Sequence, residues 1–330
     1  MFLERVHEGK NDIGRWIAMI VILVIVTQLV GGIPLAITIF MNMSANPDLE
    51  PNPDNPFDLT AYGINSLEGF TLMIIPFVLG LIALLLLIKP IHERPMLSVV
   101  TGHLSFRWKR FFWGAGVWLL LLSVYAVIAT ITGIQKIELQ FSQDTFFSLI
   151  ILSLILIPFQ TGFEELLFRG YLMQGFGLLF KYRWATLLIT SLLFGGLHYF
   201  NPEVTEFGAW ITMPQYIWFG IFFGICALMD GGLELSWGIH SINNIFLSVV
   251  FTQDSSALQT PALYKITDFN PTVDLVVLFV LTLIFMLFAS RQFGWDSWSY
   301  LLAKIDPPEN LDDEEADFPA EYDEYENDDE

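Results

Sequence analysis

Long apolar runs separated by short polar segments dominate the pattern of this chain. A run of about 18 or more mostly apolar residues is long enough to cross a bilayer as a helix. We count eight such runs, at about 13–41, 67–88, 111–134, 145–180, 184–200, 214–229, 233–252 and 272–290. In hydrocarbon, every backbone polar group needs an internal partner, which a helix provides. The pattern therefore predicts an all-α fold, a polytopic transmembrane helix bundle of about eight spans.

Two of these runs contain helix-breaking residues. Gly31, Gly32 and Pro34 interrupt the first run, and Pro158 lies within the fourth, where it predicts a bend or a break. The first run follows a basic segment, as in a signal peptide, but it is longer than the apolar region of about 7–15 residues that signal peptides carry. It is therefore expected to be an uncleaved first span.

The distribution of lysine and arginine orients the bundle. With eight spans, twelve basic residues fall on one side, whereas only Lys136 and Lys265 fall on the other. The twelve are Arg5, Lys10, Arg15, Lys89, Arg94, Arg107, Lys109, Arg110, Lys181, Arg183, Arg291 and Lys304. Because cytoplasmic loops are enriched in basic residues, both termini are predicted to be cytoplasmic.

The composition is that of a membrane protein, and the negative charge is concentrated at the C-terminal end of the chain. Hydrophobic residues make up 54% of the chain and charged residues 15%, against about 45–50% and about 25% in soluble domains. The net charge is −20, but residues 306–330 hold 14 acidic residues and no Lys or Arg. We therefore predict a transmembrane domain over 1–305 and a disordered acidic tail over 306–330. The acidity argues against nucleic-acid binding.

Ionisable side chains inside spans are costly, so each one suggests function. In the fourth run, Glu165 and Arg169 are four residues apart, and a helix places them on one face as an ion pair. Glu164 points about 100° away and has no obvious local partner, which would leave it free for proton exchange. The alternative is an ion-pair network that only holds helices together.

Two further polar motifs lie in later runs. Phe194 precedes His198 by four residues, and the histidine is either functional or simply bonded to a backbone carbonyl. His240 and Asn244 are also four residues apart, so both side chains project from one helix face. Two aligned donors suit a developing oxyanion, although hydrogen bonding between helices is the alternative. Together the three motifs indicate one polar site within the membrane.

The combination Glu164-Glu165-x-x-x-Arg169, Phe194-x-x-x-His198 and His240-x-x-x-Asn244 resembles the CAAX-protease and bacteriocin-processing family, also called the Abi family. This family includes the type II CAAX prenyl endopeptidases. The resemblance covers a protease core of about 145–250. It implies an intramembrane endopeptidase that directs water onto a peptide bond of a membrane-associated protein or peptide.

The resemblance also implies roles for the motif residues. Glu164 would be the general base, and His198 would help to hold the attacking water. His240 and Asn244 would form the oxyanion hole, with Glu165 and Arg169 as the supporting pair. No cofactor is expected, although a zinc site made of Glu164, His198 and His240 stays open.

Other functions stay open from the residues alone. The same scaffold could be a non-proteolytic membrane scaffold or a bacteriocin-immunity protein, and a transporter or channel is a third reading. The partners expected are a membrane-associated substrate and the lipid bilayer, with no nucleic acid. The short chain and the lack of organelle signals favour an integral plasma (inner) membrane protein of a bacterium.

Overall fold

The structure is a computed structural model that describes residues 1–51 and 55–306, so the predicted acidic tail falls outside it except for Asp306. Its α-helices are α1 (Ile13–Val24), α2 (Ile33–Ala45), α3 (Ser66–His92), α4 (Trp108–Thr132), α5 (Gln143–Glu165), α6 (Met173–Phe180), α7 (Arg183–Leu197), α8 (Pro202–Phe207), α9 (Ala209–Asp230), α10 (Glu234–Val249) and α11 (Pro271–Phe293). The strands are β1 (Lys136–Leu139), β2 (Phe251–Thr252) and β3 (Tyr264–Asp268). The all-α fold class is confirmed.

Six helical stretches in the described part of the chain are long and apolar enough to cross a membrane. They are Ile13–Ala45, Ser66–His92, Trp108–Thr132, Gln143–Phe180, Ala209–Asp230 and Pro271–Phe293. The other two predicted runs correspond to α7 and α10, which have 15 and 16 residues. A straight crossing needs about 20 residues, so the count of eight spans and the cytoplasmic termini stay predictions.

The helix-breaking residues act in different ways in the two long stretches. A π-helical segment, Ile25–Val30, and then Gly31 and Gly32 separate α1 from α2. A Cβ on Gly31 would lie 2.6 Å from Pro76 Cα, so glycine allows α3 to approach closely. In contrast, α5 continues through Pro158, and the departure from α-helical geometry comes later, in the π-helical segment Leu166–Leu172.

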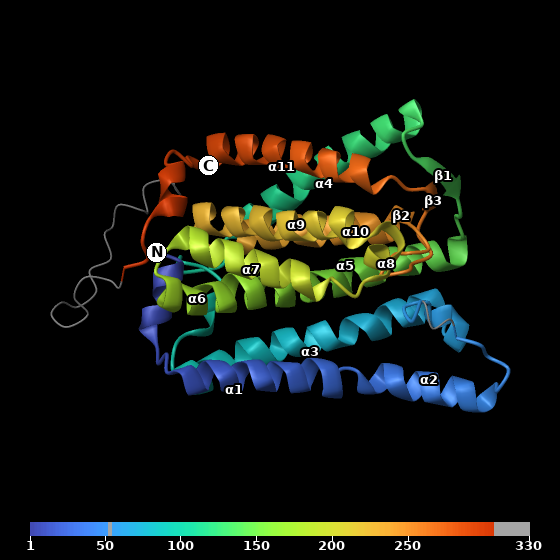
Figure 1. The fold of residues 1–330 in the computed structure, drawn as a ribbon, viewed down its shortest axis with the longest axis horizontal. Coiled ribbons are helices and arrows are strands. Elements are labelled where there is room, and N and C mark those ends of the chain that lie inside the picture. Colours follow the sequence, from blue (N-terminus) through green and yellow to red (C-terminus); the bar gives the residue numbers. More distant parts are fainter. Residues whose placement is uncertain (52–54, 307–330) are drawn as a thin grey trace, which may run out of the picture.

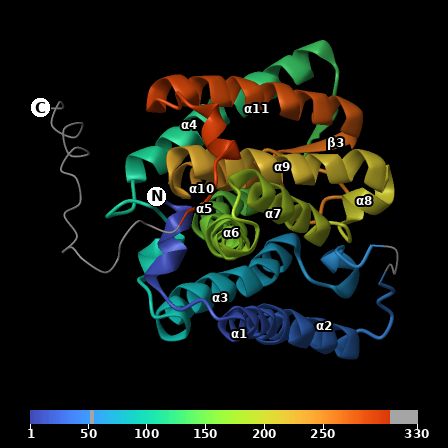
Figure 2. The same ribbon diagram turned by 60° about the vertical axis from the view of Figure 1, so that its left-hand side comes forward.

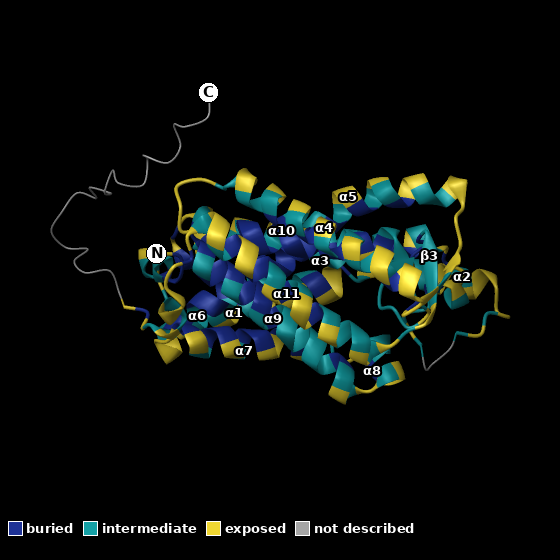
Figure 3. Ribbon diagram, turned by 90° about the horizontal axis from the view of Figure 1, so that it is seen from above, coloured by how far each residue is buried: buried dark blue, intermediate teal, exposed yellow. Residues whose placement is uncertain are grey.

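The helices run roughly side by side along the long axis of the molecule (Figure 1). α10 contacts α4, α5 and α9, while α3 packs on α5 and α7 packs on α9. Viewed from another direction, α5 and α6 are surrounded by α3, α7, α9 and α10 (Figure 2). The burial map places buried residues along these inner helices and exposed ones on outer faces (Figure 3). The interface of α5 with α10 is therefore the place where polar side chains avoid lipid.

The two ends of the bundle differ in charge and structure. The N-terminus, the α6–α7 turn and the end of α11 share one end (Figure 1), and the segments there carry the twelve basic residues. The opposite end holds a small sheet of order β1-β3-β2, in which β1 is antiparallel and β2 parallel to β3. Lys136 and Lys265 lie in this sheet. Sequence periodicity did not predict the sheet because its strands have only two to five residues.

An ion-pair cluster fixes the start of α10 at the basic end. Arg107, just before α4, binds both Asp230 and Glu234 at 2.8 Å, and Arg110 lies 3.4 Å from Asp230. Asp230 and Glu234 flank the turn between α9 and α10. Because Glu234 is fully buried, the cluster locks α4 to this turn. It thereby sets the position of α10, which carries His240.

Candidate active site

The ion pair predicted from the sequence is present. Arg169 Nη1 lies 3.0 Å from Glu165 Oε1, and both side chains are almost completely buried. Glu165 ends α5, whereas Arg169 lies in the π-helical segment that follows. Arg169 Nη2 also donates to the carbonyl oxygen of Gly220 on α9, at 3.2 Å. The pair therefore neutralises one buried carboxylate and joins α5 to α9.

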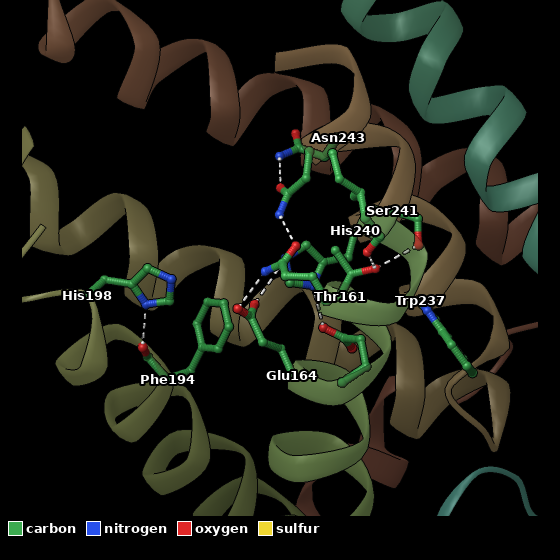
Figure 4. Close-up of polar contacts among 12 residues, drawn as sticks. Thr161, Glu164, Phe194, His198, Trp237, His240, Ser241 and Asn243 are labelled. Atoms are coloured by element: carbon green, nitrogen blue, oxygen red, sulfur yellow. Dashed lines mark hydrogen bonds and ion pairs between the residues drawn. The ribbon is translucent and has the colours of Figure 1, made fainter. Parts of the chain in front are cut away.

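His240 lies between the two glutamates of the motif (Figure 4). Its Nδ1 is 2.9 Å from Glu165 Oε1, and its Nε2 is 3.4 Å from Glu164 Oε2. A carboxylate only accepts, so Nδ1 carries the hydrogen of the shorter contact. The ring also stacks on Phe223, with centroids 4.7 Å apart. Glu165 therefore holds the imidazole with Nε2 directed at Glu164.

Glu164 is the more accessible of the two carboxylates. It is 9% exposed, against 0% for Glu165. Gln160 Nε2 donates to its Oε1 at 2.6 Å, while Oε2 has no hydrogen-bond partner among the described residues. The sequence correctly separated Glu164 from the Glu165–Arg169 pair, but it did not identify Gln160 as a partner. Glu164 is consequently the less enclosed carboxylate of this pair, and its Oε2 is a buried acceptor that no described residue satisfies.

Asn244 approaches the same face of α5 as His240. Its Nδ2 donates to Gln160 Oε1 at 3.1 Å, so Gln160 contacts both Asn244 and Glu164. One turn away, Thr161 and Ser241 hydroxyls share a hydrogen bond of 2.8 Å (Figure 4). The α5–α10 interface thus brings Glu164, His240 and Asn244 together, as the motifs predicted.

His198 is bonded in the way that a structural histidine would be. Its Nδ1 donates to the Phe194 carbonyl oxygen at 2.8 Å, because a carbonyl only accepts. Its ring stacks on Tyr216, with centroids 4.3 Å apart. Within residues 1–51 and 55–306, no hydrogen bond joins His198 to Glu164 (Figure 4). Nε2 of His198 has no hydrogen bond to the described residues, so it is the nitrogen that is left for chemistry.

The ring of Phe194 fills the space between the polar groups. Phe194 is 2% exposed. The guanidinium carbon of Arg169 lies 4.3 Å from the centre of its ring, and the rings of His198 and His240 lie 4.8 and 6.1 Å away, centroid to centroid. Phe194 therefore packs against both histidines and covers the buried arginine.

The zinc alternative needs Glu164, His198 and His240 to converge. Glu164 and His240 are in contact, but His198 is turned to the Phe194 carbonyl. Over the described ranges, no three His, Cys, Asp or Glu side chains form a group that could hold a metal ion. In this arrangement the three residues do not fit a His₂Glu zinc site.

Comparison with known proteins agrees with the motifs. Residues 143–246 match the family model described as type II CAAX prenyl endopeptidase Rce1-like. The family resemblance is confirmed for this segment, which contains Glu164, His198, His240 and Asn244. The chain is also 29% identical, over 281 residues, to the uncharacterized protein YyaK of Bacillus subtilis (strain 168), with 84% of this chain and 91% of that protein covered. No solved structure matches.

Three polar residues of the site escaped the sequence analysis. Gln160, Asn243 and Trp118 all take part in the hydrogen bonds around Glu164 and Asn244. One signal was available, because Gln160 lies one helical turn before Glu164 in an otherwise apolar run. Trp118 comes from a distant helix, and nothing in its local sequence links it to the motifs.

Proposed function

We propose that this protein is an intramembrane endopeptidase that hydrolyses a peptide bond in a membrane-associated protein or peptide. The observation that supports this most is the buried Glu164, which faces His240 within the family-matched segment and has one oxygen without a hydrogen-bond partner among the described residues. The family is named for a prenyl endopeptidase, which supports a protease and a membrane setting. The relative from Bacillus subtilis supports a bacterial plasma membrane.

In the proposed mechanism, Glu164 acts as the general base. Its free carboxylate oxygen takes a proton from a water molecule while the water oxygen attacks the peptide carbonyl carbon. Glu164 then gives that proton to the leaving amine, which breaks the carbon–nitrogen bond and releases two peptides. His198, through Nε2, orients the water. No covalent enzyme intermediate forms.

The carbonyl oxygen becomes negative as water attacks, and it needs donors. His240 Nε2, when protonated, and Asn244 Nδ2 supply them. Glu165 accepts from His240 Nδ1 and from Arg169 at the same time, which fixes the imidazole ring with Nε2 directed at Glu164. An amide nitrogen has two hydrogens, so Asn244 keeps one after it donates to Gln160.

The test is cleavage of a quenched fluorescent peptide library by the purified protein in detergent. Wild type is compared with Glu164→Gln and with a matched control, Asp274→Asn, whose carboxylate accepts from Tyr125 and Gln135 at the α4–α11 contact. We expect cleavage by wild type and the control, and its loss in Glu164→Gln. Full cleavage by Glu164→Gln would overturn the mechanism.

A metal chelator distinguishes the proposed glutamate protease from a zinc protease. A cellular phenotype distinguishes it from a non-proteolytic scaffold. Cleavage that survives the chelator supports glutamate chemistry, whereas loss restored by zinc favours a metal. For a non-proteolytic scaffold or immunity protein, the cellular phenotype would persist in the Glu164→Gln and His198→Ala variants. A protease would lose it in both.

A further inference from the structure

Four hydrogen bonds in series connect the core of the bundle to Glu164. Trp118 Nε1 on α4 donates to Asn243 Oδ1 at 3.1 Å, and Asn243 Nδ2 donates to Asn244 Oδ1 at 3.1 Å. Asn244 Nδ2 then donates to Gln160 Oε1 at 3.1 Å, and Gln160 Nε2 donates to Glu164 Oε1 at 2.6 Å. The three amides are thus aligned, each accepting through oxygen and donating through nitrogen.

The two ends of this series fix its direction. An indole nitrogen is a donor only, and a carboxylate is an acceptor only. The nitrogen and oxygen of a side-chain amide have nearly the same shape, so neighbours decide which way the group points. With Trp118 donating at one end, Asn243, Asn244 and Gln160 have one orientation that satisfies all four bonds. In the reversed orientation, Gln160 Oε1 would face Glu164 Oε1, and both of these atoms are acceptors.

Burial makes that orientation costly to change. Trp118, Asn243 and Gln160 are 1%, 6% and 6% exposed. Phe222 and Phe285 pack on the indole of Trp118, with ring centroids 5.3 and 5.9 Å away. A buried polar atom that loses its partner cannot exchange it for bulk water. A hydrogen-bonded series of this kind therefore has two discrete directions, and the indole of Trp118 and the carboxylate of Glu164 both favour the same one.

We infer that Trp118, Asn243 and Gln160 are positioning residues, and that Trp118, together with the Glu164 carboxylate at the other end, holds this amide series in one direction. The inference rests on the proposed function, in which Asn244 is an oxyanion donor and Glu164 the base. In the observed direction, Asn244 directs Nδ2 toward the α5 face and Gln160 donates to Glu164. In the opposite direction, Asn244 Oδ1 would take that place and would repel an oxyanion.

The first test removes the donor at the start of the series. Trp118→Phe keeps an aromatic ring and deletes the indole N–H. Its matched control is Trp237→Phe, which deletes an indole N–H that donates to the Pro158 carbonyl outside the series, at 2.8 Å. We expect kcat to fall about tenfold in Trp118→Phe, the effect of roughly one hydrogen bond, with KM within about twofold. Trp237→Phe should change kcat much less.

The second test reverses the series and does not depend on the first variant folding. Asn243→Asp still accepts from Trp118 but has no donor when ionised, so Asn244 must turn its Nδ2 toward residue 243. We expect kcat to fall by about a hundredfold, the usual effect of losing one oxyanion donor, with little change in KM. Gln160→Leu, which removes the last link, should also lower kcat.

The outcomes separate this inference from the proposed function. If Glu164→Gln abolishes cleavage while Trp118→Phe and Asn243→Asp keep wild-type kcat, the amide series has no positioning role and the protease assignment stands. If Glu164→Gln itself retains cleavage, the proposed function fails. If Trp118→Phe and Trp237→Phe lower kcat equally, the effect is general packing and the inference is overturned.

Discussion

Two arginines, Arg169 and Arg94, are buried to the same extent, and each is 1% exposed. Arg169 forms an ion pair with Glu165, next to a histidine and a second carboxylate. Arg94 donates to neutral acceptors, Gln174 Oε1 at 2.8 Å and the Arg5 carbonyl oxygen at 3.4 Å. No carboxylate lies within ion-pair distance of Arg94 in the described part of the chain, and burial lowers its pKa to about 10.

The surroundings of Arg94 indicate a structural role. Gln174 Nε2 donates to the carbonyl oxygens of Phe2 and Ser98. Arg94 and Gln174 therefore fasten the N-terminal segment and the loop after α3 to α6. The hydrogen bonds of Arg94 and Gln174 end on amide and backbone oxygens, which have no acid–base chemistry near neutral pH. Around Arg169, in contrast, two carboxylates and a histidine meet. Burial of a charge alone does not mark a site, whereas the chemistry of its partners does.

The largest expected effect comes from Glu164, the less enclosed carboxylate of the Arg169 cluster. Glu164→Gln keeps the size of the side chain and its bond to Gln160 but cannot act as a base. We expect kcat/KM for peptide cleavage to fall by about 10²–10⁴, the usual contribution of a general base. The thermal midpoint in detergent should stay within a few degrees of wild type. Activity near the wild-type value would mean that the Arg169 cluster, like the Arg94 cluster, has only a structural role.

The ion pair itself gives the second prediction. Arg169→Met leaves Glu165 as an uncompensated buried charge, which costs about 3–5 kcal/mol of stability. The double variant Glu165→Gln/Arg169→Met removes both charges, so its thermal midpoint should recover much of the loss. Cleavage should stay low in both. In the single variant Glu165 loses the arginine that positions it beside His240, and in the double variant His240 loses its carboxylate partner. A double variant that regains cleavage would show that the pair acts on stability alone.

Arg94→Met should give the opposite result to Arg169→Met. The change removes a buried cation and its bonds to Gln174 and Arg5, so we expect stability to fall by about 1–3 kcal/mol. The kcat of the folded fraction should stay within about twofold, because the hydrogen bonds of Arg94 and Gln174 among the described residues lead to Arg5, Phe2 and Ser98 and not to the α5–α10 site. Thermal unfolding and active-site-normalised cleavage measure the two effects. A loss of kcat without a matching loss of stability would mean that the contacts of Arg94 affect the geometry of the α5–α10 site.

Sequence alone predicted much of the fold because long apolar runs have few structural solutions in a bilayer. The Glu165–Arg169 pair was predictable for a similar reason, since helical spacing dictates it. The link from Trp118 to Asn243 was not, because it joins helices 125 residues apart in the chain. The buried Arg94 also escaped, because a basic residue in a loop looks like a solvated charge until tertiary packing covers it.

The smallest expected effect concerns Glu203, a half-buried residue outside the site whose second carboxylate oxygen is buried. It accepts from the Ala257 backbone N–H at 3.1 Å, while its second oxygen has no partner among the described residues. Burial raises the pKa of Glu203. A raised folded-state pKa means that folding favours the protonated form, so its stabilising contribution is present at low pH and is lost as pH rises through that pKa.

Glu203→Gln tests this sign directly. The amide keeps an acceptor for Ala257 and cannot ionise, so the thermal midpoint of the variant should exceed that of wild type above the raised pKa. The expected difference is about 2–4 °C, the shift of roughly 1 kcal/mol in a protein larger than about 150 residues. It should vanish at low pH, where both side chains are neutral. Glu138→Gln, at an exposed position in β1, should show no such trend. A constant difference at every pH would mean that ionisation of Glu203 does not oppose folding. Glu203 would then resemble neither Arg94, which has a structural role, nor Arg169, which lies at the candidate site.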